Sequence, residues 1–580
     1  MTNNKNYKGS LRLDWINKDL SLYYEIDEKQ GKGVRPVWVP KNDIRVAEPR
    51  ILRFIKSYGD PTSENMLIKG DNLLVLRSLV EMFKGRQEKD KVKCIYIDPP
   101  YNTGNAFRHY DDNLKHSEWL TMMRDRLYLL KKLLRKDGII FVQISEDEVA
   151  YLKCLMDETF GRDKYLSTIV IKTKSGAGVG QESFLMTISE YILVYAATDK
   201  KLAKNYQKYF QSPIDESVTN NYHFIFEGPG NEKCIKTIKS SRVGDIKVFL
   251  HSKFKITNLE KLERTQSAYY KHFEKIFRTT NPQGGLMKKI MPQLPNNELV
   301  SIEHIPSKGR NKGKIHKSYF YKGALIVWLH DTAIKDTLNK TVNKLVKSNN
   351  FWEENLWQGI DPEGKVKFPQ SKKPEKLIKR ILEMTTKETD LVMDSFSGSG
   401  TTGAVAHKMN RRWIMVEIGR HAEELIIPRL QRVISGEDQT GISKEIGWKG
   451  GGGFKYYKLG ESVIHEQDMN WALKAEEMAE AIFLHFQYKP IKAEWLEKEN
   501  MYLGKHQFAR FHFALSFAAR EVKVINEDLY EKIIAGLEKE KFKHLTIFTN
   551  VAVAVPPESL DERVMVKKIP AAILREYNLL

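Results

Sequence analysis

The sequence is poor in cysteine. Its three cysteines, Cys94, Cys154 and Cys234, lie far apart, and none belongs to a Cys-x-x-Cys pair. This pattern argues against a disulfide framework and against a structural zinc site. No metal site is therefore expected. The free thiols suit a reducing compartment, which predicts a cytoplasmic protein.

Long apolar runs are also missing. No stretch reaches the roughly 18 apolar residues that cross a bilayer, so no membrane partner is expected. The first residues, MTNNKNYKGSLRLDW, lack the apolar core of a signal peptide. The sequence also contains no Walker A motif and no internal repeats.

Acidic residues are scarce in one part of the chain. The formal net charge is +20 over 580 residues, and residues 251–350 hold 19 Lys and Arg against 7 Asp and Glu, a local net charge of +12. Residues 461–580 come to −3. Concentrated positive charge is typical of a surface that binds a polyanion, although a basic surface can also serve solubility alone.

Strand and helix patterns alternate in two separated parts of the chain. Between about residues 65 and 197, four β-prone runs alternate with helical patterns, one of which predicts a helix over 117–138 that ends at Gly138. The alternation returns over 373–419. It predicts an α/β fold with an open, doubly wound, largely parallel sheet.

The length suggests roughly three or four domains. The patterns divide the chain into an N-terminal arm (1–60), a first core part (61–215), a basic domain (216–350), a second core part (351–455) and an α+β C-terminal domain (456–580). The glycine-rich stretch GWKGGGGFKYY, residues 447–457, is expected to be a linker or a flexible loop.

A glycine turn follows one predicted strand in DLVMDSFSGSGTTG, residues 390–403. Gly398 and Gly400 allow a ligand to approach the backbone, and the next helix offers free N–H groups at its start. Glu417 ends the following strand, where an acid can accept both hydroxyls of a ribose. The turn also satisfies Gly-x-Gly-x-x-Gly, so a nicotinamide or flavin site is an alternative to another adenosine-containing ligand.

A second unusual turn ends the strand in CIYIDPPYNTG, residues 94–104. Pro99 and Pro100 hold the chain rigid between the carboxylate of Asp98 and the ring of Tyr101. An exocyclic amine of a nucleobase is a poor nucleophile, and two aimed acceptors, Asp98 and the Pro99 carbonyl, would favour its reactive form. The Tyr101 ring could stack on a base flipped out of a duplex.

DPPY together with FSGSG resembles the DNA amino-methyltransferases that modify the exocyclic amine of adenine. The catalytic stretch precedes the cofactor turn by about three hundred residues, which resembles the circularly permuted order called the β class. The resemblance implies a Rossmann-like methyltransferase core and S-adenosyl-L-methionine as cofactor. It also implies a target-recognition domain inserted between the halves, where the basic block lies.

The resemblance assigns roles to individual residues. LIKGDNLLVLRSL would place Asp71 near the cofactor adenine, and FPQSKKPEKLI would place Lys373 at its methionine end, with the roles of Ser371 and Lys372 left open. The expected catalytic residues are Asp98, Pro99, Pro100 and Tyr101. The expected cofactor-binding residues are Asp71, Asp98, Lys373, Asp394, Phe396, Ser397, Gly398, Gly400, Thr401, Thr402 and Glu417.

Within the β class, the chain length, the segment GWKGGGGFKYYKLG and the C-terminal extension resemble the Mod subunit of type III restriction–modification systems. That resemblance implies a homodimer acting on double-stranded DNA, with a helicase–nuclease (Res) subunit as partner. The weakly acidic C-terminal residues suit contacts with protein.

The stretch KGRNKGKIHKSYFYKG, residues 308–323, combines basic and aromatic residues and is the predicted DNA contact. The residues expected to bind DNA are Lys308, Arg310, Lys312, Lys314, Lys317, Tyr319 and Tyr321. The alternative is a basic surface hairpin whose aromatic side chains form a small core.

The expected activity is transfer of a methyl group from S-adenosylmethionine to the N6 amine of adenine in double-stranded DNA, as the modification subunit of a type III system. Four alternatives stay open: N4 methylation of cytosine, a solitary methyltransferase without a nuclease partner, a specificity subunit that mainly guides a nuclease, and a nicotinamide oxidoreductase.

Overall fold

The structure of the protein is a computed structural model. It describes residues 12–26, 34–102, 106–107, 110–111, 116–174, 185–203, 209–239, 245–282, 285–296, 298–306, 313–337, 339–353, 356–368, 372–465, 468–485, 488–491, 501–506, 511–516, 524–539, 544–569 and 571–576. The described chain forms two compact units, residues 1–206 with 349–580, and residues 207–348.

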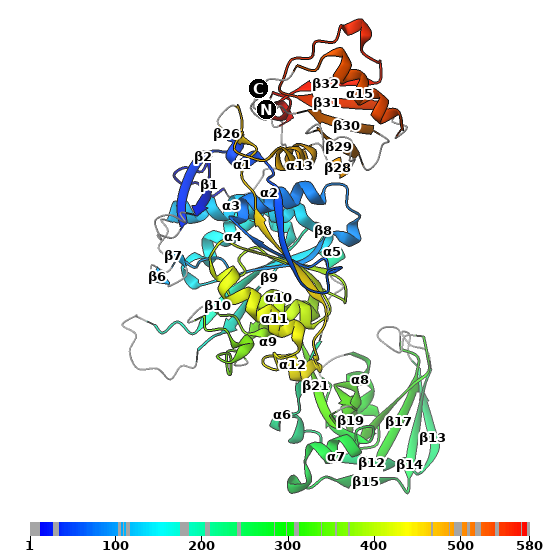
Figure 1. The fold of residues 1–580 in the computed structure, drawn as a ribbon. Coiled ribbons are helices and arrows are strands. Elements are labelled where there is room, and N and C mark those ends of the chain that lie inside the picture. The colour runs from blue at the N-terminus through cyan, green and yellow to red at the C-terminus, as the bar shows by residue number, and fades with distance from the viewer. Residues whose placement is uncertain are drawn as a thin grey trace. The chain divides into compact units, whose positions relative to one another are not determined.

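The centre of the first unit is a ten-stranded sheet (Figure 1). Its strands, in spatial order, are β22 (Phe351–Trp352), β9 (Tyr165–Lys172), β10 (Ser189–Ala196), β8 (Leu134–Ile144), β5 (Val92–Ile97), β23 (Leu391–Asp394), β24 (Arg412–Glu417), β4 (Met66–Lys69), β25 (Gly453–Leu459) and β3 (Leu52–Gly59). The pairs from β8 to β25 are parallel, whereas β10 runs antiparallel to both neighbours and β3 runs antiparallel to β25.

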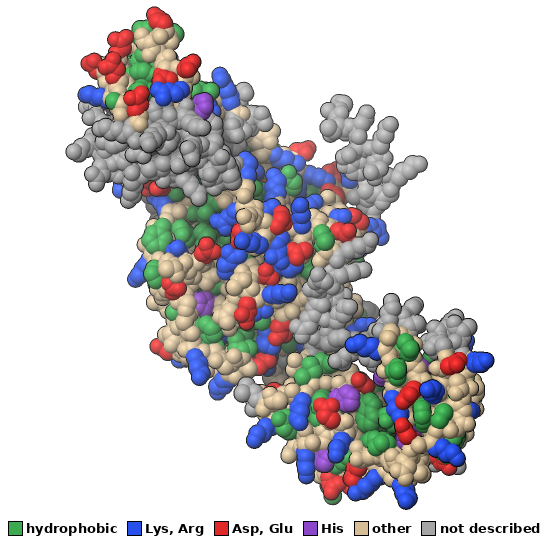
Figure 2. All heavy atoms as spheres, turned by 90° about the vertical axis from the view of Figure 1, so that its right-hand side faces the viewer, with side chains coloured by type: hydrophobic (Ala, Val, Ile, Leu, Met, Phe, Trp, Pro, Cys, Tyr) green, Lys and Arg blue, Asp and Glu red, His purple; other side chains and the backbone are tan. Residues whose placement is uncertain are grey.

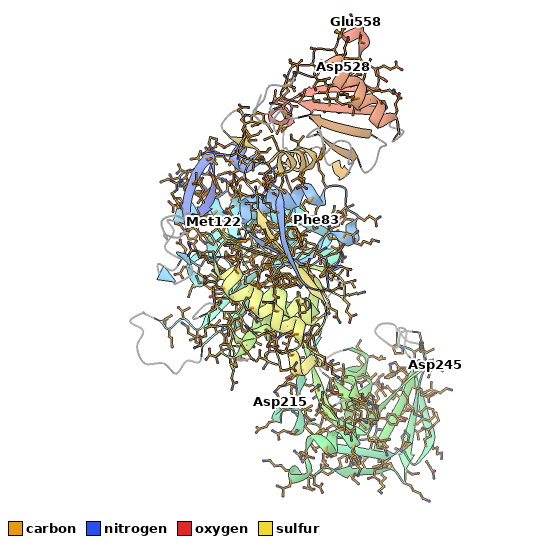
Figure 3. All side chains as sticks on the ribbon, in the orientation of Figure 1. Phe83, Met122, Asp215, Asp245, Asp528 and Glu558 are labelled. Carbon is orange, nitrogen blue, oxygen red and sulfur yellow. The ribbon has the colours of Figure 1, made fainter. Side chains whose placement is uncertain are left out.

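Helices cover both faces of this sheet, as the doubly wound prediction requires (Figure 1). One face packs against α2 (Asn72–Phe83), α3 (His116–Leu133) and α4 (Glu146–Phe160). The other packs against α9 (Glu375–Thr385), α10 (Thr401–Lys408) and α11 (Ile427–Ser435). Phe83 and Met122, from α2 and α3, are buried in the first of these layers (Figure 3).

The predicted helix over 117–138 is too long. The structure ends α3 at Leu133 and begins β8 at Leu134. Gly138 lies inside the strand, where an added Cβ would come within 3.1 Å of the carbonyl of Val92 on β5. The glycine therefore permits close approach of two strands, rather than ending a helix.

The glycine-rich stretch predicted to be a linker leads directly into the sheet. Gly450, Gly451 and Gly452 have positive φ angles, and β25 begins at Gly453 and pairs with both β3 and β4. An added Cβ at Gly453 would come within 2.4 Å of the backbone nitrogen of Asp60. The glycines are needed here for turning and close packing, and not for flexibility.

The segment predicted to be an N-terminal arm is also part of the core. Residues 52–59 form the edge strand β3, and β1 (Leu20–Ile26) pairs with β2 (Val34–Pro40) in a ribbon whose Leu22 and Val39 are buried. The short helix α1 (Ile44–Ala47) follows. The prediction failed because the apolar residues of this segment are sparse and scattered, although they pack against α2 and α3.

Residues beyond β25 form a smaller mixed sheet with helices. Its strands are β28 (Tyr488–Ile491), β29 (Met501–His506), β30 (Phe511–Ser516), β31 (His544–Thr549) and β32 (Val564–Lys568), accompanied by α13 (Ala475–His485), α15 (Glu527–Lys539) and α16 (Ala571–Glu576). This arrangement agrees with the α+β character expected for the C-terminal part. No helix of the described chain has the length and apolar character needed to cross a membrane.

The second unit, residues 207–348, is mostly antiparallel sheet. Eight strands follow in the order β13 (Asn231–Ile238), β14 (Ile246–Ser252), β17 (Leu299–His304), β18 (His316–Tyr321), β19 (Ala324–Trp328), β16 (Ile276–Thr280), β12 (Phe224–Gly228) and β15 (Lys255–Asn258). A smaller sheet contains β11 (Tyr209–Pro213), β21 (Thr341–Lys347) and β20 (Ala333–Asp336). The sequence patterns did not resolve these short strands.

A buried cluster of charges ties α9, α10 and α11 together. Both oxygens of Glu375 accept hydrogen bonds from Lys408, at 3.0 and 2.8 Å, and one also accepts from Arg429 at 2.8 Å. Lys408 also contacts Asp438 at 2.8 Å, and all four side chains are fully buried. Because the ion pairs of these four buried side chains lie within the cluster, removing one member leaves an opposite charge without its ionic partner.

The variant Glu375→Ala should therefore lower the unfolding free energy by about 3–5 kcal/mol, because it leaves two buried cations without their shared partner. Urea denaturation followed by circular dichroism measures this change. The matched control is Glu383→Ala on the same helix, where the partly exposed Glu383 forms a surface ion pair with Lys379, and about 0.5 kcal/mol is expected. Equal losses in the two variants would contradict the structural role of the cluster.

Candidate active site

The two unusual turns of the sequence lie at neighbouring strand ends. β23 pairs in parallel with β5, and β24 pairs in parallel with β23. The turn after Ile97, the turn after Asp394 and the strand-end residue Glu417 therefore meet at one carboxyl edge of the sheet. Open parallel α/β sheets bind their ligands at this edge.

Asp98 lies in a partly buried group of charges. Its Oδ2 is 3.0 Å from the ammonium nitrogen of Lys373, and its Oδ1 accepts a hydrogen bond from the Tyr101 hydroxyl at 2.7 Å. Burial raises the pKa of Asp98, while the Lys373 cation opposes that rise and the negative charge of Glu190 adds to it. The Asp98 carboxylate therefore already accepts an N–H donor, the ammonium of Lys373.

Tyr101 is held in place by contacts at its hydroxyl and at its ring. Its hydroxyl lies 2.7 Å from Asp98 and 2.7 Å from Glu190, and the ammonium of Lys373 lies 4.8 Å from the ring centroid. The indole N–H of Trp119 on α3 donates a hydrogen bond to the carbonyl of Pro100 at 2.7 Å, which anchors the rigid turn. The ring therefore has a fixed orientation, as a surface that stacks on a base requires.

Glu190 was not predicted as a site residue. It is the second residue of β10 and is partly buried, and its Oε2 accepts hydrogen bonds from Tyr101 and, at 2.5 Å, from the amide of Gln143 on β8. The Tyr96 hydroxyl donates to the other end of the same amide at 2.6 Å. The only sequence signal was an acid placed within a strand of otherwise apolar residues, EYILVYAA.

The glycine turn has the backbone geometry predicted for it. Gly398 and Gly400 have φ angles of 49° and 75°. An added Cβ at Gly400 would come within 2.8 Å of Ile426, so close packing requires the glycine there. Among the described residues, the nearest atom at Gly398 would be a ring carbon of Phe368 at 3.8 Å, so these residues leave the surface above this glycine open to a ligand.

Glu417 connects β24 to this turn. Its carboxylate accepts hydrogen bonds from the backbone N–H of Gly398 at 2.8 Å and of Gly419 at 3.0 Å, and it lies 3.0 Å from the ring of His421. Burial alone would raise the pKa of Glu417, but the charge and hydrogen bond of His421 and the two backbone donors lower it overall. His421 was missed by the sequence analysis because no motif marks it.

Asp394 stabilises the turn internally. It is 2% exposed, and its carboxylate accepts hydrogen bonds from the backbone N–H of Phe396 at 2.9 Å and the Thr402 hydroxyl at 2.6 Å. The Ser397 hydroxyl donates to the Asp394 carbonyl at 3.1 Å, and Thr401 accepts from Arg429 at 2.8 Å. Of the residues predicted to bind a cofactor, these therefore hold the shape of the turn through contacts within the protein.

Asp71 has a structural environment. Its Oδ1 caps α2 by accepting from the backbone N–H of Leu73 and Leu74, and its Oδ2 accepts from Tyr24 N–H at 3.1 Å and from Arg126 at 2.9 Å. Four donors already occupy this buried carboxylate. The predicted contact with a cofactor adenine stays a prediction, and it requires one of these donors to give way.

The two neighbouring lysines before α9 have different surroundings. Lys373 reaches Asp98, whereas Lys372 donates to three backbone carbonyls, those of Asp361, Glu363 and Val366, at 2.8–3.2 Å. Lys372 therefore holds its own loop together. Ser371 lies outside the described residues.

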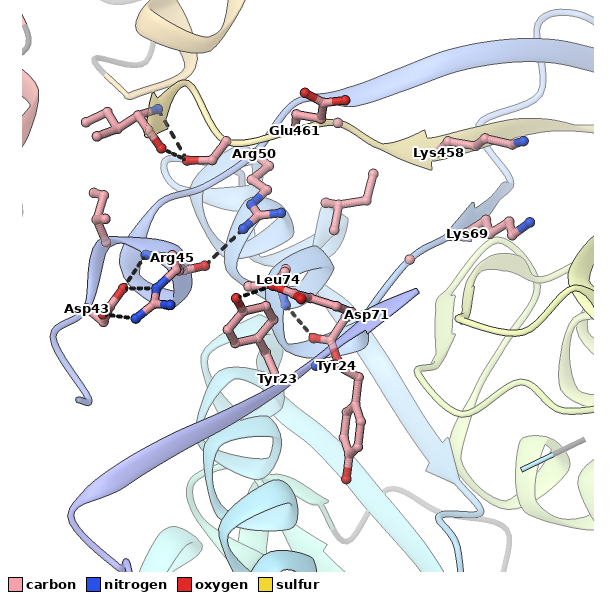
Figure 4. A pocket seen from close by; sticks show the side chains of 17 residues that line it. Tyr23, Tyr24, Asp43, Arg45, Arg50, Lys69, Asp71, Leu74, Lys458 and Glu461 are labelled. Carbon is pink, nitrogen blue, oxygen red and sulfur yellow. Dashed lines mark hydrogen bonds and ion pairs between the residues drawn. The ribbon is translucent and has the colours of Figure 1, made fainter. Parts of the chain in front are cut away.

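A cavity of about 950 Å³ opens at the carboxyl ends of β4 and β25 (Figure 4). Asp71 lines it, but neither Asp98 nor Glu417 does. Its charged walls are largely paired within the protein, because Arg45 binds Asp43 and both Lys69 and Lys458 bind Glu423. The cavity is therefore a separate part of the same sheet edge. The cavity is also lined by Tyr23, Tyr24, Arg50, Leu74 and Glu461 (Figure 4).

The predicted DNA-binding residues have different surroundings. Lys308, Arg310 and Lys312 lie outside the described residues, and Lys314 is exposed. Lys317 contacts Glu232 and lies 3.5 Å from Glu303. A phosphate would have to compete with two carboxylates for this ammonium.

Tyr319 and Tyr321 are partly buried in an aromatic cluster of the second unit. Their ring centroids lie 5.5 Å from Phe226 and 5.8 Å from Phe224, respectively. This packing matches the alternative of a hairpin with a small aromatic core. Figure 2 shows Lys and Arg side chains on this unit with Asp and Glu side chains among them. Contact of these residues with DNA stays a prediction.

The chain is similar to known proteins over more than half of its length. Residues 92–428 match the model of a family of N6/N4 DNA methylases. The chain is 40% identical over 426 residues to a probable type III restriction-modification enzyme HindVI Mod subunit of Haemophilus influenzae, covering 70% of this chain and 55% of that protein. It is 27% identical to the StyLTI Mod subunit of Salmonella typhimurium (69% and 56% covered) and 26% identical to the EcoP15I Mod subunit of Escherichia coli (60% and 57% covered). The chain thus spans little more than half the length of these relatives.

The variant Asp394→Asn should change how stability depends on pH. Burial raises the pKa of Asp394 to about 7, well above the value near 3.9 of an unfolded chain. The folded state therefore binds this proton more tightly, so the contribution of Asp394 to stability is greatest below about pH 4 and falls as the pH rises towards 7. Asparagine cannot ionise, and the unfolding free energy of the variant relative to wild type should rise over that range by a few kcal/mol, at roughly 1.4 kcal/mol per pKa unit.

Urea denaturation at several pH values measures this difference. The control is Asp528→Asn, at an exposed position in the first turn of α15 (Figure 3), which should follow wild type at every pH. A constant difference between Asp394→Asn and wild type across pH 4–7 would contradict a buried, protonated Asp394.

Proposed function

Because the chain belongs to the family of N6/N4 DNA methylases, we propose that it transfers a methyl group from S-adenosylmethionine to the N6 amine of adenine in double-stranded DNA. The observation that supports this most is the parallel pairing of β5 with β23. It sets the acidic, aromatic turn at Asp98 beside the glycine turn after Asp394, which are the two parts that methyl transfer to a base needs. An oxidoreductase would have no use for the first of them.

The residues around the glycine turn fit the cofactor. Glu417 offers a carboxylate to ribose hydroxyls, and the open surface above Gly398 allows a ligand to approach the backbone. Phe396 follows Asp394 and is half-buried, which suits an apolar contact. When bound, the cofactor's sulfonium supplies an already activated methyl group, so the protein has mainly to position the acceptor.

Asp98 would orient the acceptor amine. In the structure its Oδ2 accepts an N–H donor, the ammonium of Lys373, and an amine hydrogen of adenine would take the same kind of position. The Pro99 carbonyl would accept the second hydrogen. Tyr101, whose ring is fixed by its hydroxyl contacts, would stack on the flipped base. Adenine is favoured over cytosine because the residue before Pro-Pro-Tyr is Asp and not Ser.

The wider role is that of the modification subunit of a type III restriction–modification system. The names of the relatives, which are Mod subunits of such enzymes, support this. The basic unit of residues 207–348 would contact the DNA, and a second copy of the chain and a helicase–nuclease (Res) subunit would be its protein partners. A cytoplasmic location follows from that role.

The variant Asp98→Ala should lower the rate of methyl transfer by about 10³-fold or more, because the amine loses its charged acceptor. Cofactor affinity should stay close to that of wild type, because Glu417 and the glycine turn are untouched. Mass spectrometry of nucleosides from methylated DNA measures the product, and isothermal titration with S-adenosylmethionine measures the affinity. Asp528→Ala is the matched control and should behave as wild type.

Three results would contradict the proposal. If the wild-type protein produced N4-methylcytosine, the acceptor would be cytosine and not adenine. Undiminished transfer by Asp98→Ala would refute the role of Asp98. Loss of cofactor binding in that variant would show that Asp98 belongs to the cofactor site instead.

A further inference from the structure

Two carboxylates share one phenol in this site. The Tyr101 hydroxyl oxygen lies 2.7 Å from Oδ1 of Asp98 and 2.7 Å from Oε2 of Glu190. Both separations are typical of an O–H···O hydrogen bond. A phenol has a single hydrogen, so it can donate to only one of these oxygens at a time. The other short contact needs a hydrogen on a carboxyl group.

The neighbours of Glu190 do not supply that hydrogen to Tyr101. Gln143 donates its amide N–H to Glu190 Oε2 at 2.5 Å, and this amide is oriented by Tyr96, whose hydroxyl donates to the Gln143 oxygen at 2.6 Å. Lys373 lies 3.0 Å from Asp98 and 3.8 Å from Glu190. This one cation therefore faces two acids. The three side chains together are neutral only if one of the acids carries a proton.

We propose that Glu190 shares a single proton with Asp98 through the Tyr101 hydroxyl and thereby sets the charge of Asp98. With the proton on Glu190, Glu190 donates to Tyr101, Tyr101 donates to Asp98, and Asp98 is ionised. With the proton on Asp98, both hydrogen bonds reverse their direction. Only the first arrangement leaves Asp98 ionised as an acceptor for the amine, so Glu190 is a positioning residue. This role rests on the proposed function.

The charges around the pair predict how it responds to substitution. Glu190 raises the pKa of Asp98 and Lys373 lowers it, with burial as the largest influence. Among the described residues, the other ionisable groups that face the pair are Tyr101, Tyr96 and Asp394. Because the two acids are coupled, the acid limb of the pH–rate profile reports an apparent pKa of the pair.

The variant Glu190→Gln keeps a side chain of the same shape and carries no charge, like the protonated form of Glu190. The acid limb of kcat for methyl transfer should therefore stay close to that of wild type. Lys373→Met removes the cation, and its acid limb should move to higher pH. Glu388→Gln, at an exposed residue before β23, is the matched control and should keep the wild-type profile.

A second readout does not depend on activity. Infrared spectra of the protein without cofactor or DNA should contain a protonated-carboxyl band at neutral pH that is reduced in both Glu190→Gln and Asp98→Asn. Tyr101→Phe removes the bridge, so the protonated-carboxyl band should be reduced in this variant too. This comparison stays informative if one single variant folds poorly.

The outcomes separate this inference from the proposed function. Wild-type protein without methyl transfer to adenine would refute the function, whereas the infrared comparison would still test the shared proton. Normal transfer with an acid limb moved to lower pH in Glu190→Gln would refute the inference alone, because it would show that Glu190 is ionised in the wild-type protein. A band unchanged in both carboxyl variants, or in Tyr101→Phe, would refute it as well.

Discussion

The parallel pairing of β5 with β23 is the constraint on which the site depends. The two strands are fully buried, and helices cover both faces of the sheet around them. Their burial removes water from the backbone, so the strands must satisfy each other's hydrogen bonds. This requirement joins two segments that lie about three hundred residues apart in the sequence. The turns that follow both strands then emerge at the same edge.

Burial next to charge determines the chemistry at that edge. Asp98, Asp394 and Glu417 all lose water, yet the pKa of Glu417 falls while those of the other two rise. The difference comes from their partners. Glu417 has His421 and two backbone donors, whereas Asp98 shares one cation with Glu190. Neighbouring carboxylates of one small region thus have different roles.

The predicted strands and helices are confirmed where the local sequence pattern agrees with the fold. The strands ending at Ile97, Asp394 and Glu417 are short apolar runs before turn residues, and the structure contains each of them. Prediction failed at Gly138 and Gly453, where the glycines were interpreted as a helix end and a linker. Both glycines instead allow a strand to approach neighbouring backbone. The sequence shows that a glycine has no side chain, but it does not show which neighbouring atom a side chain at that position would contact.

The sequence by itself determined the chemistry of the two motifs, because DPPY and FSGSG name the residue types and the rigid or open backbone that each turn needs. It also determined the alternation of strands and helices. Only the tertiary structure decided which side chains surround Asp98. Glu190, Gln143 and Lys373 come from three separate elements, and no spacing along the chain relates them. Their meeting follows from sheet order and burial, which are properties of the whole fold.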